Sequence, residues 1–244
     1  MSGRVAVVTG ATGGIGSAIC LQLARAGSRV VLTYKNRKGE ARALAEQLPG
    51  DDHLVVRAAV DDSSSLAELA ERIAAHYGRL DLLVNNAGVT RFVPHNDLWG
   101  LDDALIDQIF TVNWRGAFAC VRALKDLLGE TGGVVVNISS LAGVTGNGSN
   151  VAYCASKAAL DSMTRSLARA LAPEIRVVSV SPGLTDGRYT EQLDSDWSQQ
   201  QVEQTPLRRL AAANDVANAV LAVVTHLTFS TGCVIPVDGG RPLT

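Results

Sequence analysis

Cysteine is scarce in this sequence and is not grouped. The four cysteines, Cys20, Cys120, Cys154 and Cys233, lie far apart and form no C-x-x-C pair, and the four histidines do not cluster. Neither a zinc site nor a disulfide framework is therefore indicated. This use of cysteine is typical of a reducing compartment, so we expect a cytoplasmic protein without a bound metal.

The chain also lacks an excess of charge and any long apolar run. Its formal net charge is −2, with both signs scattered along the sequence, so no basic patch favours nucleic acid or an anionic membrane surface. No apolar run approaches the ~20 residues that a membrane span needs. The chain opens directly on an apolar strand pattern without a charged and apolar leader. We expect a soluble protein that is not exported.

Apolar residues, in contrast, are abundant. A chain of 244 residues with 47% hydrophobic residues can bury a full core, and α/β folds of this length are commonly one domain. Short β-branched runs alternate with amphipathic segments, which indicates one parallel sheet covered on both sides. Strands are predicted over Arg4–Val8, Ser28–Tyr34, His53–Ala59, Leu80–Val84, Val134–Ile138, Ile175–Val180 and Gly232–Val237. Helices are predicted from Gly14 and over Gly39–Leu48, Ser63–Tyr77, Asp102–Leu128, Val151–Leu171 and Asn214–His226, with a less regular segment over Thr185–Gln204.

A glycine-rich turn, Thr9–Gly16, follows the first predicted strand. Glycine at such a turn lets backbone N–H groups approach a pyrophosphate, whose negative charge the dipole of the following helix favours. The spacing of Gly10, Gly14 and Gly16 differs from G-x-G-x-x-G, and no Gly-Lys-Ser/Thr follows as in a P-loop. We predict a dinucleotide site here. The alternative is a tight turn that is rich in glycine for packing alone.

Small and polar residues follow four of the predicted strands, at Thr9–Gly10, Asn85–Gly88, Ser139–Ser140 and Ser181–Gly183. The carboxyl ends of parallel strands share one edge of a sheet, and ligands of open α/β sheets bind in the crevice there. The sequence therefore predicts a single ligand crevice.

Two residues of one predicted helix are candidates for proton transfer. Tyr153 and Lys157 lie at i and i+4, so their side chains face the same way. A free phenol has a pKa of about 10, and a neighbouring ammonium favours the phenolate, so Tyr153 is a candidate acid/base near neutral pH. Ser140 could bind the same substrate oxygen, and Asn113 could hold a water next to Lys157. Alone, each feature has an ordinary alternative: a solvated helix face, a turn or a cap.

These motifs form one ordered set: Thr9–Gly16, Asn85–Gly88, Asn113, Ser140, Tyr153–Lys157, Pro182–Gly183 and Val237–Gly240. In order and spacing the set resembles the short-chain dehydrogenases/reductases over nearly the whole chain. The resemblance implies a single-domain, Rossmann-like, doubly wound α/β fold with about seven parallel strands, and hydride transfer between a nicotinamide and a carbonyl or alcohol carbon. It implies Tyr153 as acid/base, with Lys157 lowering its pKa and binding the nicotinamide ribose. Ser140 would position the carbonyl oxygen and Asn113 would support a proton relay.

The resemblance also implies where the dinucleotide lies. The acid that would bind the ribose hydroxyls of NAD is replaced by Tyr34, which Lys35, Asn36 and Arg37 follow. Because Arg or Lys suits a 2′-phosphate, we expect NADP(H) rather than NAD(H); the alternative is that these bases only solvate a loop. The implied cofactor residues are Gly10, Thr12, Gly13, Gly14, Ile15, Gly16, Tyr34, Lys35, Asn36, Arg37, Val60, Asp61, Asn86, Ala87, Gly88, Tyr153, Lys157, Pro182, Gly183 and Thr185.

Three positions depart from the family pattern. Ala59 stands where Asp or Asn is usual, which leaves Asp61 or the backbone for the adenine. Gly187 replaces a frequent threonine, which leaves Thr185 as the nicotinamide contact. Ser179 stands where asparagine is frequent, and the sequence gives no physical reason for that change.

The sequence leaves the substrate open. We expect the crevice to be covered by the segment Thr185–Gln204, with Tyr189 and Trp197, and flanked by Arg91, Phe92, His95 and Trp99. Relatives that reduce 3-oxoacyl-carrier-protein thioesters often carry basic residues where this chain has Glu130–Gly132 and Pro173–Glu174. The acids of this chain argue against such a substrate, which stays an alternative. A small ketone, a sugar or a secondary alcohol is equally compatible with the sequence.

The resemblance further implies a homotetramer built on the helices Asp102–Leu128 and Val151–Leu171. Two alternatives to a carbonyl reductase remain at this point. One is a regulatory protein that senses the nicotinamide without turnover. The other is an epimerase or dehydratase with tightly held NAD.

Overall fold

A parallel sheet forms the centre of the computed structural model, which describes residues 1–187 and 195–243. Its strands are β1 (Val5–Val8), β2 (Arg29–Tyr34), β3 (Leu54–Arg57), β4 (Leu82–Asn85), β5 (Val134–Ile138), β6 (Arg176–Pro182) and β7 (Val234–Val237). They lie in the order β3-β2-β1-β4-β5-β6-β7, and every neighbouring pair is parallel. The order reverses between β1 and β4, which is where ligands of such sheets bind.

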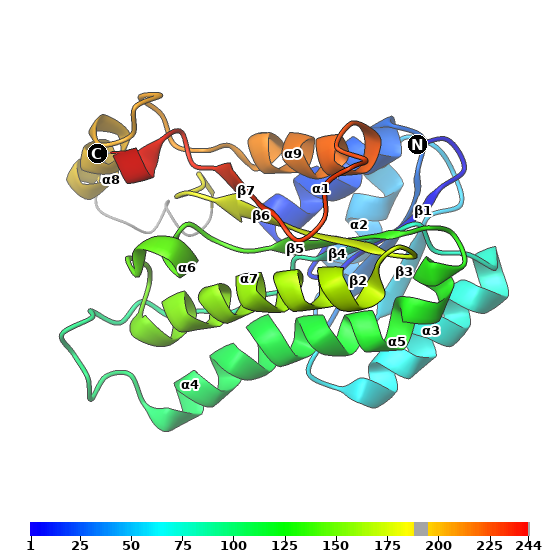
Figure 1. The fold of residues 1–244 in the computed structure, drawn as a ribbon, viewed down its shortest axis with the longest axis horizontal. Coiled ribbons are helices and arrows are strands. Elements are labelled where there is room, and N and C mark those ends of the chain that lie inside the picture. Colours follow the sequence, from blue (N-terminus) through cyan, green and yellow to red (C-terminus); the bar gives the residue numbers. More distant parts are fainter. Residues whose placement is uncertain (188–194, 244) are drawn as a thin grey trace.

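Helices cover both faces of this sheet. They are α1 (Gly14–Arg25), α2 (Lys38–Gln47), α3 (Ser63–Tyr77), α4 (Asp103–Phe110), the π-helical η1 (Thr111–Gly116), α5 (Ala117–Gly129), α6 (Ala142–Thr145), α7 (Val151–Leu171), α8 (Ser195–Glu203), α9 (Ala213–Thr225) and the 3₁₀ turn η3 (Arg241–Leu243). Figure 1 shows α1, α2 and α9 on one face and α3, α4, α5 and α7 on the other, with α6 and α8 beyond one end of the sheet. The expected doubly wound α/β fold of seven strands is confirmed. No helix of the described ranges is long and apolar enough to cross a bilayer.

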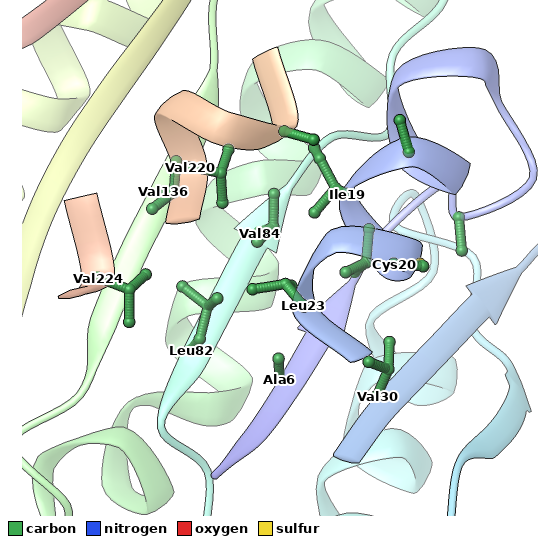
Figure 2. Close-up of a cluster of buried hydrophobic side chains, with 14 of the residues drawn as sticks. Ala6, Ile19, Cys20, Leu23, Val30, Leu82, Val84, Val136, Val220 and Val224 are labelled. Atoms are coloured by element: carbon green, nitrogen blue, oxygen red, sulfur yellow. The ribbon is translucent and has the colours of Figure 1, made fainter. Parts of the chain in front are cut away.

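Burial on both faces explains why the strands are almost continuously apolar. Successive residues of a strand point to opposite faces, so Ala6 and Val8 pack against α1 and α9, whereas Val5 and Val7 pack against α3 and α5. Figure 2 shows the first layer, where Ile19 and its neighbours on α1 meet the sheet. Each such side chain contributes ~1.5–3 kcal/mol when fully buried. These two layers fix the strand ends that carry the polar clusters.

The helices α3 and α7 begin at residues whose side chains cap the first turn. The helix predicted over Ser63–Tyr77 is α3, and the carboxylate of Asp62 accepts hydrogen bonds from the N–H groups of Ser64 (3.0 Å) and Ser65 (3.4 Å). The long helix α7 begins in the same way at Asn150, whose side-chain oxygen accepts from the N–H of Tyr153 at 2.7 Å. That cap fixes the first turn of α7, which carries Tyr153.

The long helical region predicted over Asp102–Leu128 is present as α4, η1 and α5, which follow one another without a gap; the π-helical η1 contains Asn113. One expectation about regular structure needs correction. The segment Thr185–Gln204 is not irregular throughout, because α8 occupies Ser195–Glu203. Its polar sequence has little apolar periodicity, which is why the pattern did not indicate a helix. Tyr189 lies outside the described residues.

Candidate active site

Three of the four polar clusters that follow strands, Asn85–Gly88, Ser139–Ser140 and Ser181–Gly183, contribute to the lining of one cavity of about 1010 Å³. Its lining includes the start of α1, the turns after β4 and β5, the first two turns of α7, and the turn after β6. The predicted site residues that line it are Ile15, Asn86, Gly88, Ser140, Tyr153, Lys157, Pro182, Gly183 and Thr185. The single crevice expected from the sequence is therefore present, at the carboxyl edge of the sheet.

The glycine-rich turn is held in place by the turn after β4. The Asn86 amide donates hydrogen bonds to the carbonyls of Thr9 (2.9 Å) and Gly10 (3.0 Å), and the Thr9 hydroxyl accepts from the N–H groups of Asn86 and Ala87. Gly10 has φ of 62°, a conformation that favours glycine. At Gly16 a Cβ would overlap the Gly10 carbonyl and lie 2.7 Å from the Asn86 amide nitrogen. Gly10, Gly16 and the Asn86 side chain thus shape the turn.

Gly13 and Gly14 differ from these two glycines, because no close packing requires them. A Cβ at Gly14 would meet nothing within 4 Å, and one at Gly13 would meet only the Gly10 carbonyl, at 3.5 Å. Both residues are exposed at the start of α1, whose first turn has no side-chain cap and no acidic residue. Open space beside uncapped N–H groups fits the pyrophosphate of a dinucleotide. The residues present therefore fit the cofactor that the sequence predicts.

Tyr153 and Lys157 lie together on the face of α7 that borders the cavity. The Lys157 ammonium nitrogen lies 5.7 Å from the centre of the Tyr153 ring and donates a 2.8 Å hydrogen bond to the carbonyl of Ile138, at the end of β5. Lys157 is only 5% exposed. Burial lowers its pKa to about 8, while the charge of Asp161 acts in the opposite direction. The buried ammonium therefore lies beside the Tyr153 ring.

Ser140 lies on the same cavity, at the turn after β5. Its hydroxyl oxygen accepts a 3.2 Å hydrogen bond from the N–H of Ala142, at the start of α6. The hydroxyl hydrogen is not used in that bond, so Ser140 can donate it to a ligand in the cavity. The neighbouring Ser139 is buried and approaches the backbone carbonyl of Lys157 instead, at 3.4 Å.

Asn113 lies in η1 and is 1% exposed. Its amide donates to the carbonyl of Val89 (3.1 Å) and to the Ser156 hydroxyl (3.1 Å), and its oxygen accepts from the N–H of Val89 (2.8 Å). Ser156 in turn donates to the carbonyl of Tyr153. The side chain thus joins the loop after β4 to the helix that carries Tyr153, with its amide hydrogens directed at protein atoms. A water held by Asn113 remains a prediction.

The residues expected around the adenine ribose lie away from the cavity lining, at the ends of β2 and β3. The Lys35 ammonium forms a 2.6 Å ion pair with Asp61, which lowers the pKa of that carboxyl, and Arg115 donates to the Asp61 carbonyl at 2.9 Å. Arg37 lies 3.5 Å from Glu40. The two basic residues therefore differ in their partners. Lys35 pairs with Asp61, which follows β3, whereas Arg37 lies near Glu40 of the helix that follows it.

Only some of the residues that were expected around the substrate line the cavity. Phe92, His95 and Trp197 line the cavity, whereas Trp99 is 96% exposed and Arg91 pairs with Asp102 instead. The C-terminal part also contributes side chains that the sequence did not single out as site residues, namely Gln201, Thr205, Arg209, Asp238 and Arg241. Asp238 belongs to the Val237–Gly240 motif, and Gln201 lies in the segment Thr185–Gln204 that was expected to cover the crevice. For Thr205, Arg209 and Arg241 the sequence offers no signal, because only folding brings them to this edge.

Ser179, the departure without a reason in the sequence, lies in a buried polar chain. Its hydroxyl is 2.8 Å from that of Thr164 on α7, and Thr164 accepts a 2.8 Å hydrogen bond from the Asn137 amide. Asn137 in turn accepts from Asn85 at 2.9 Å. A serine at this position thus links β6 to α7, and through α7 to β5 and β4.

A parallel sheet whose glycine-rich turn, Tyr–Lys pair and serine meet at one cavity defines a dinucleotide-binding oxidoreductase. Among residues 1–187 and 195–243, no three His, Cys, Asp or Glu side chains gather to hold a metal ion. A family model described as enoyl-(acyl carrier protein) reductase matches residues 10–241.

Known proteins narrow the class further. The chain is 35% identical over 242 residues to the 3-oxoacyl-[acyl-carrier-protein] reductase FabG of Staphylococcus aureus, with 97% of each chain covered. It is 38% identical over 249 residues to FabG of Aquifex aeolicus, with 98% of each covered. The solved structure of the short-chain dehydrogenase/reductase SDR:Glucose/ribitol dehydrogenase from Brucella melitensis matches with a TM-score of 0.93 and 31% identity, over 99% of this chain and 97% of that one.

The chain belongs to the short-chain dehydrogenase/reductase family. It is an oxidoreductase that interconverts carbonyl and alcohol groups with a nicotinamide cofactor. The resemblance inferred from the motifs is thereby confirmed.

Proposed function

We propose that this enzyme reduces a ketone to a secondary alcohol, reversibly, with NADP(H) as cofactor and Tyr153 as the acid/base. The observation that supports this most directly is that Ser140, Tyr153 and Lys157 line one cavity together with Ile15 at the start of α1. The cavity therefore extends from the phosphate-binding turn to the groups that can transfer a proton.

Each polar group has a distinct part in the proposed reaction. The bound nicotinamide supplies the hydride. Ser140 and Tyr153 donate hydrogen bonds to the substrate carbonyl oxygen, and the Tyr153 hydroxyl gives its proton to that oxygen as negative charge develops there. Lys157 stabilises the phenolate that remains and binds the nicotinamide ribose. Asn113 holds the loop after β4 against α7 and supports the proton relay.

The preference for NADP(H) rests on the end of β2. Tyr34 leaves no acid there to repel a 2′-phosphate or to bind free ribose hydroxyls. Since Lys35 is paired with Asp61 at 2.6 Å, whereas Arg37 lies 3.5 Å from Glu40, we assign the phosphate mainly to Arg37 and to the backbone near Asn36. The glycine-rich turn, Val60 and the Asn86–Gly88 segment then hold the rest of the dinucleotide.

For the substrate, a small free ketone is our first proposal. The relatives named 3-oxoacyl-[acyl-carrier-protein] reductase favour a second candidate, a 3-oxoacyl thioester on a carrier protein. However, this chain has Glu130 and Glu174 at the positions where such reductases often carry basic residues, so its charge there is opposite to theirs. Comparing kcat/KM for a carrier-bound and a free 3-oxoacyl substrate distinguishes the two.

A cytoplasmic homotetramer is part of the same proposal. Trp114 of η1 and Phe118 of α5 are partly exposed, with rings stacked 6.2 Å apart, and Val151 at the start of α7 is 46% exposed. Apolar side chains exposed on these helices support their use as a subunit interface. Light scattering behind a sizing column measures the assembly, and a monomeric mass would contradict it.

The test of the proposed reaction is Tyr153→Phe. The variant keeps the ring and removes the proton, so turnover should fall by about three orders of magnitude or more, while the Kd for NADPH stays within about twofold. Stopped-flow reduction of a ketone and NADPH fluorescence titration measure the two quantities. Near-normal turnover in Tyr153→Phe would remove Tyr153 from the mechanism.

A further inference from the structure

Asp161 is a buried acid for which the reaction above has no use. It lies on α7 four residues after Lys157 and eight after Tyr153, so the three side chains follow one face of the helix. Asp161 is only 4% exposed, and its Oδ1 atom has no hydrogen-bond partner in the described part of the chain. A buried carboxylate without full hydrogen bonding is costly unless an opposite charge lies near.

The opposite charge is the Lys157 ammonium, one helical turn away. It is buried as well, and it donates to the Ile138 carbonyl at 2.8 Å. No direct ion pair within 4 Å joins the two residues among the contacts of the described ranges, so the attraction acts through a short stretch of protein interior. Burial lowers the pKa of Lys157, and Asp161 is the charge that raises it again.

In the described part of the chain, the elements that pack against α7 carry no other buried charged side chain. Their charged residues are Asp103 and Asp107 of α4, Arg115 of η1, Arg122, Lys125 and Asp126 of α5, and Arg176 of β6; β5 and α6 contribute none. All except Arg176 are exposed. Arg176 starts its strand, away from the carboxyl edge, and donates to the carbonyls of Val223, Leu227 and Ser230. On α7 itself, Cys154 is a buried thiol, and Arg165 and Arg169 are exposed.

We propose that Asp161 is a positioning residue: its buried negative charge keeps Lys157 protonated at neutral pH, where the ammonium acts on Tyr153 and on the cofactor ribose. The consequence for turnover rests on the proposed function, whereas the effect on the charge of Lys157 does not. Within this proposal, an enzyme that buries its essential ammonium requires a second buried charge to keep it ionised near pH 7.

The chain offers an unusually direct measurement, because it contains only four lysines. Lys35, Lys38 and Lys125 are exposed and serve as internal references for NMR titration of protein labelled with ¹³C at the lysine Cε atoms. In the wild type, the Lys157 signal should titrate near pH 8. In Asp161→Asn, which keeps size and shape, its midpoint should move down by about one pH unit, with the other three unchanged.

Thr164→Val is the matched control, one turn further along the same buried face. It removes the hydrogen bonds to Asn137 and Ser179 without changing any charge. It should lower the unfolding midpoint and leave the Lys157 titration in place. Loss of packing and loss of charge are thereby separated.

The second readout is functional. In Asp161→Asn, the decrease in NADPH affinity and in kcat at alkaline pH should begin about one pH unit lower than in the wild type, with little change near pH 6. If the NMR midpoint moves but the activity profile does not, Asp161 sets the charge of Lys157 and the role of Lys157 in the proposed reaction is wrong.

Two results would overturn the proposal. One is a Lys157 midpoint within about 0.2 pH units of the wild type in a folded Asp161→Asn protein, because one close buried charge should move it several times further. The other needs no variant: ¹³C NMR of the aspartate carboxyl groups in the wild type would show Asp161 protonated at pH 7, and a neutral acid cannot sustain the ammonium.

Discussion

Replacing Gly16 by alanine should lower the stability of the fold, whereas replacing Gly14 by alanine should lower the affinity for NADPH. At Gly16 the new methyl group would overlap the Gly10 carbonyl and lie 2.7 Å from the Asn86 amide nitrogen and 3.1 Å from Ala11 Cα. The Gly10 carbonyl and Ala11 Cα are backbone atoms, so moving them would cost free energy of folding. At Gly14 a methyl group meets no protein atom within 4 Å.

The expected magnitudes follow from this geometry. Overpacking costs about 1–3 kcal/mol, so Gly16→Ala should lower the Tm by roughly 2–4 °C for each kcal/mol lost in a chain of this size. Gly14→Ala should leave stability unchanged or raise it by up to about 1 kcal/mol, since alanine is the better helix former. If the methyl group displaces one charge-assisted hydrogen bond to phosphate, NADPH affinity should fall about tenfold or more.

Thermal unfolding without cofactor and NADPH fluorescence titration separate the two effects. Gly14→Ala should fold like the wild type and bind poorly, whereas Gly16→Ala should be less stable before any cofactor is added. Wild-type NADPH affinity in Gly14→Ala would refute the assignment of this turn to the pyrophosphate. Unchanged stability in Gly16→Ala would show that the turn adjusts without cost.

Two further predictions concern single charged side chains. Arg37→Ala should weaken NADPH binding at least tenfold more than NADH binding, and Lys35→Ala much less, because Lys35 is held by Asp61; equal losses for both cofactors in Arg37→Ala would place the phosphate elsewhere. Lys157 has a pKa of about 8 in the folded protein and an ordinary value of 10.5, so the unfolded chain holds more protons between these pH values and the folded state gains stability as pH rises. Urea unfolding should show this gain, up to about 3 kcal/mol, in the wild type relative to Lys157→Met, and parallel curves for the two proteins would contradict it.

Much of the fold was predictable because the spacing of apolar residues along the chain matches the repeat of the helix or strand that forms there. The strand Val134–Ile138 and the helices Ser63–Tyr77 and Val151–Leu171 have the predicted bounds. The helix α8 was missed because its nine residues are largely polar, and η1 because a π-helical turn leaves no signature in apolar spacing. Where periodicity is weak, tertiary contacts decide the structure.

The roles of particular side chains were less predictable than their positions. Asn86 was predicted to bind cofactor, which stays a prediction, and the structure adds that its amide holds the glycine-rich turn through Thr9 and Gly10. Lys35 was predicted to bind the phosphate, and its ion pair with Asp61 was not predicted. Each of these partners lies at least 26 residues away, at a distance over which sequence spacing says nothing about contact.

By itself, the sequence determined that strands and helices alternate, that glycine follows the first strand, and that Tyr153 and Lys157 share a helix face. These features depend on neighbours a few residues apart, whose geometry the helix and strand repeats fix. Only the tertiary structure decided which groups are removed from water together. The depressed pKa of Lys157 and the nearby unpartnered carboxylate of Asp161 arise because α7 packs against the sheet, and both charges are buried by that contact.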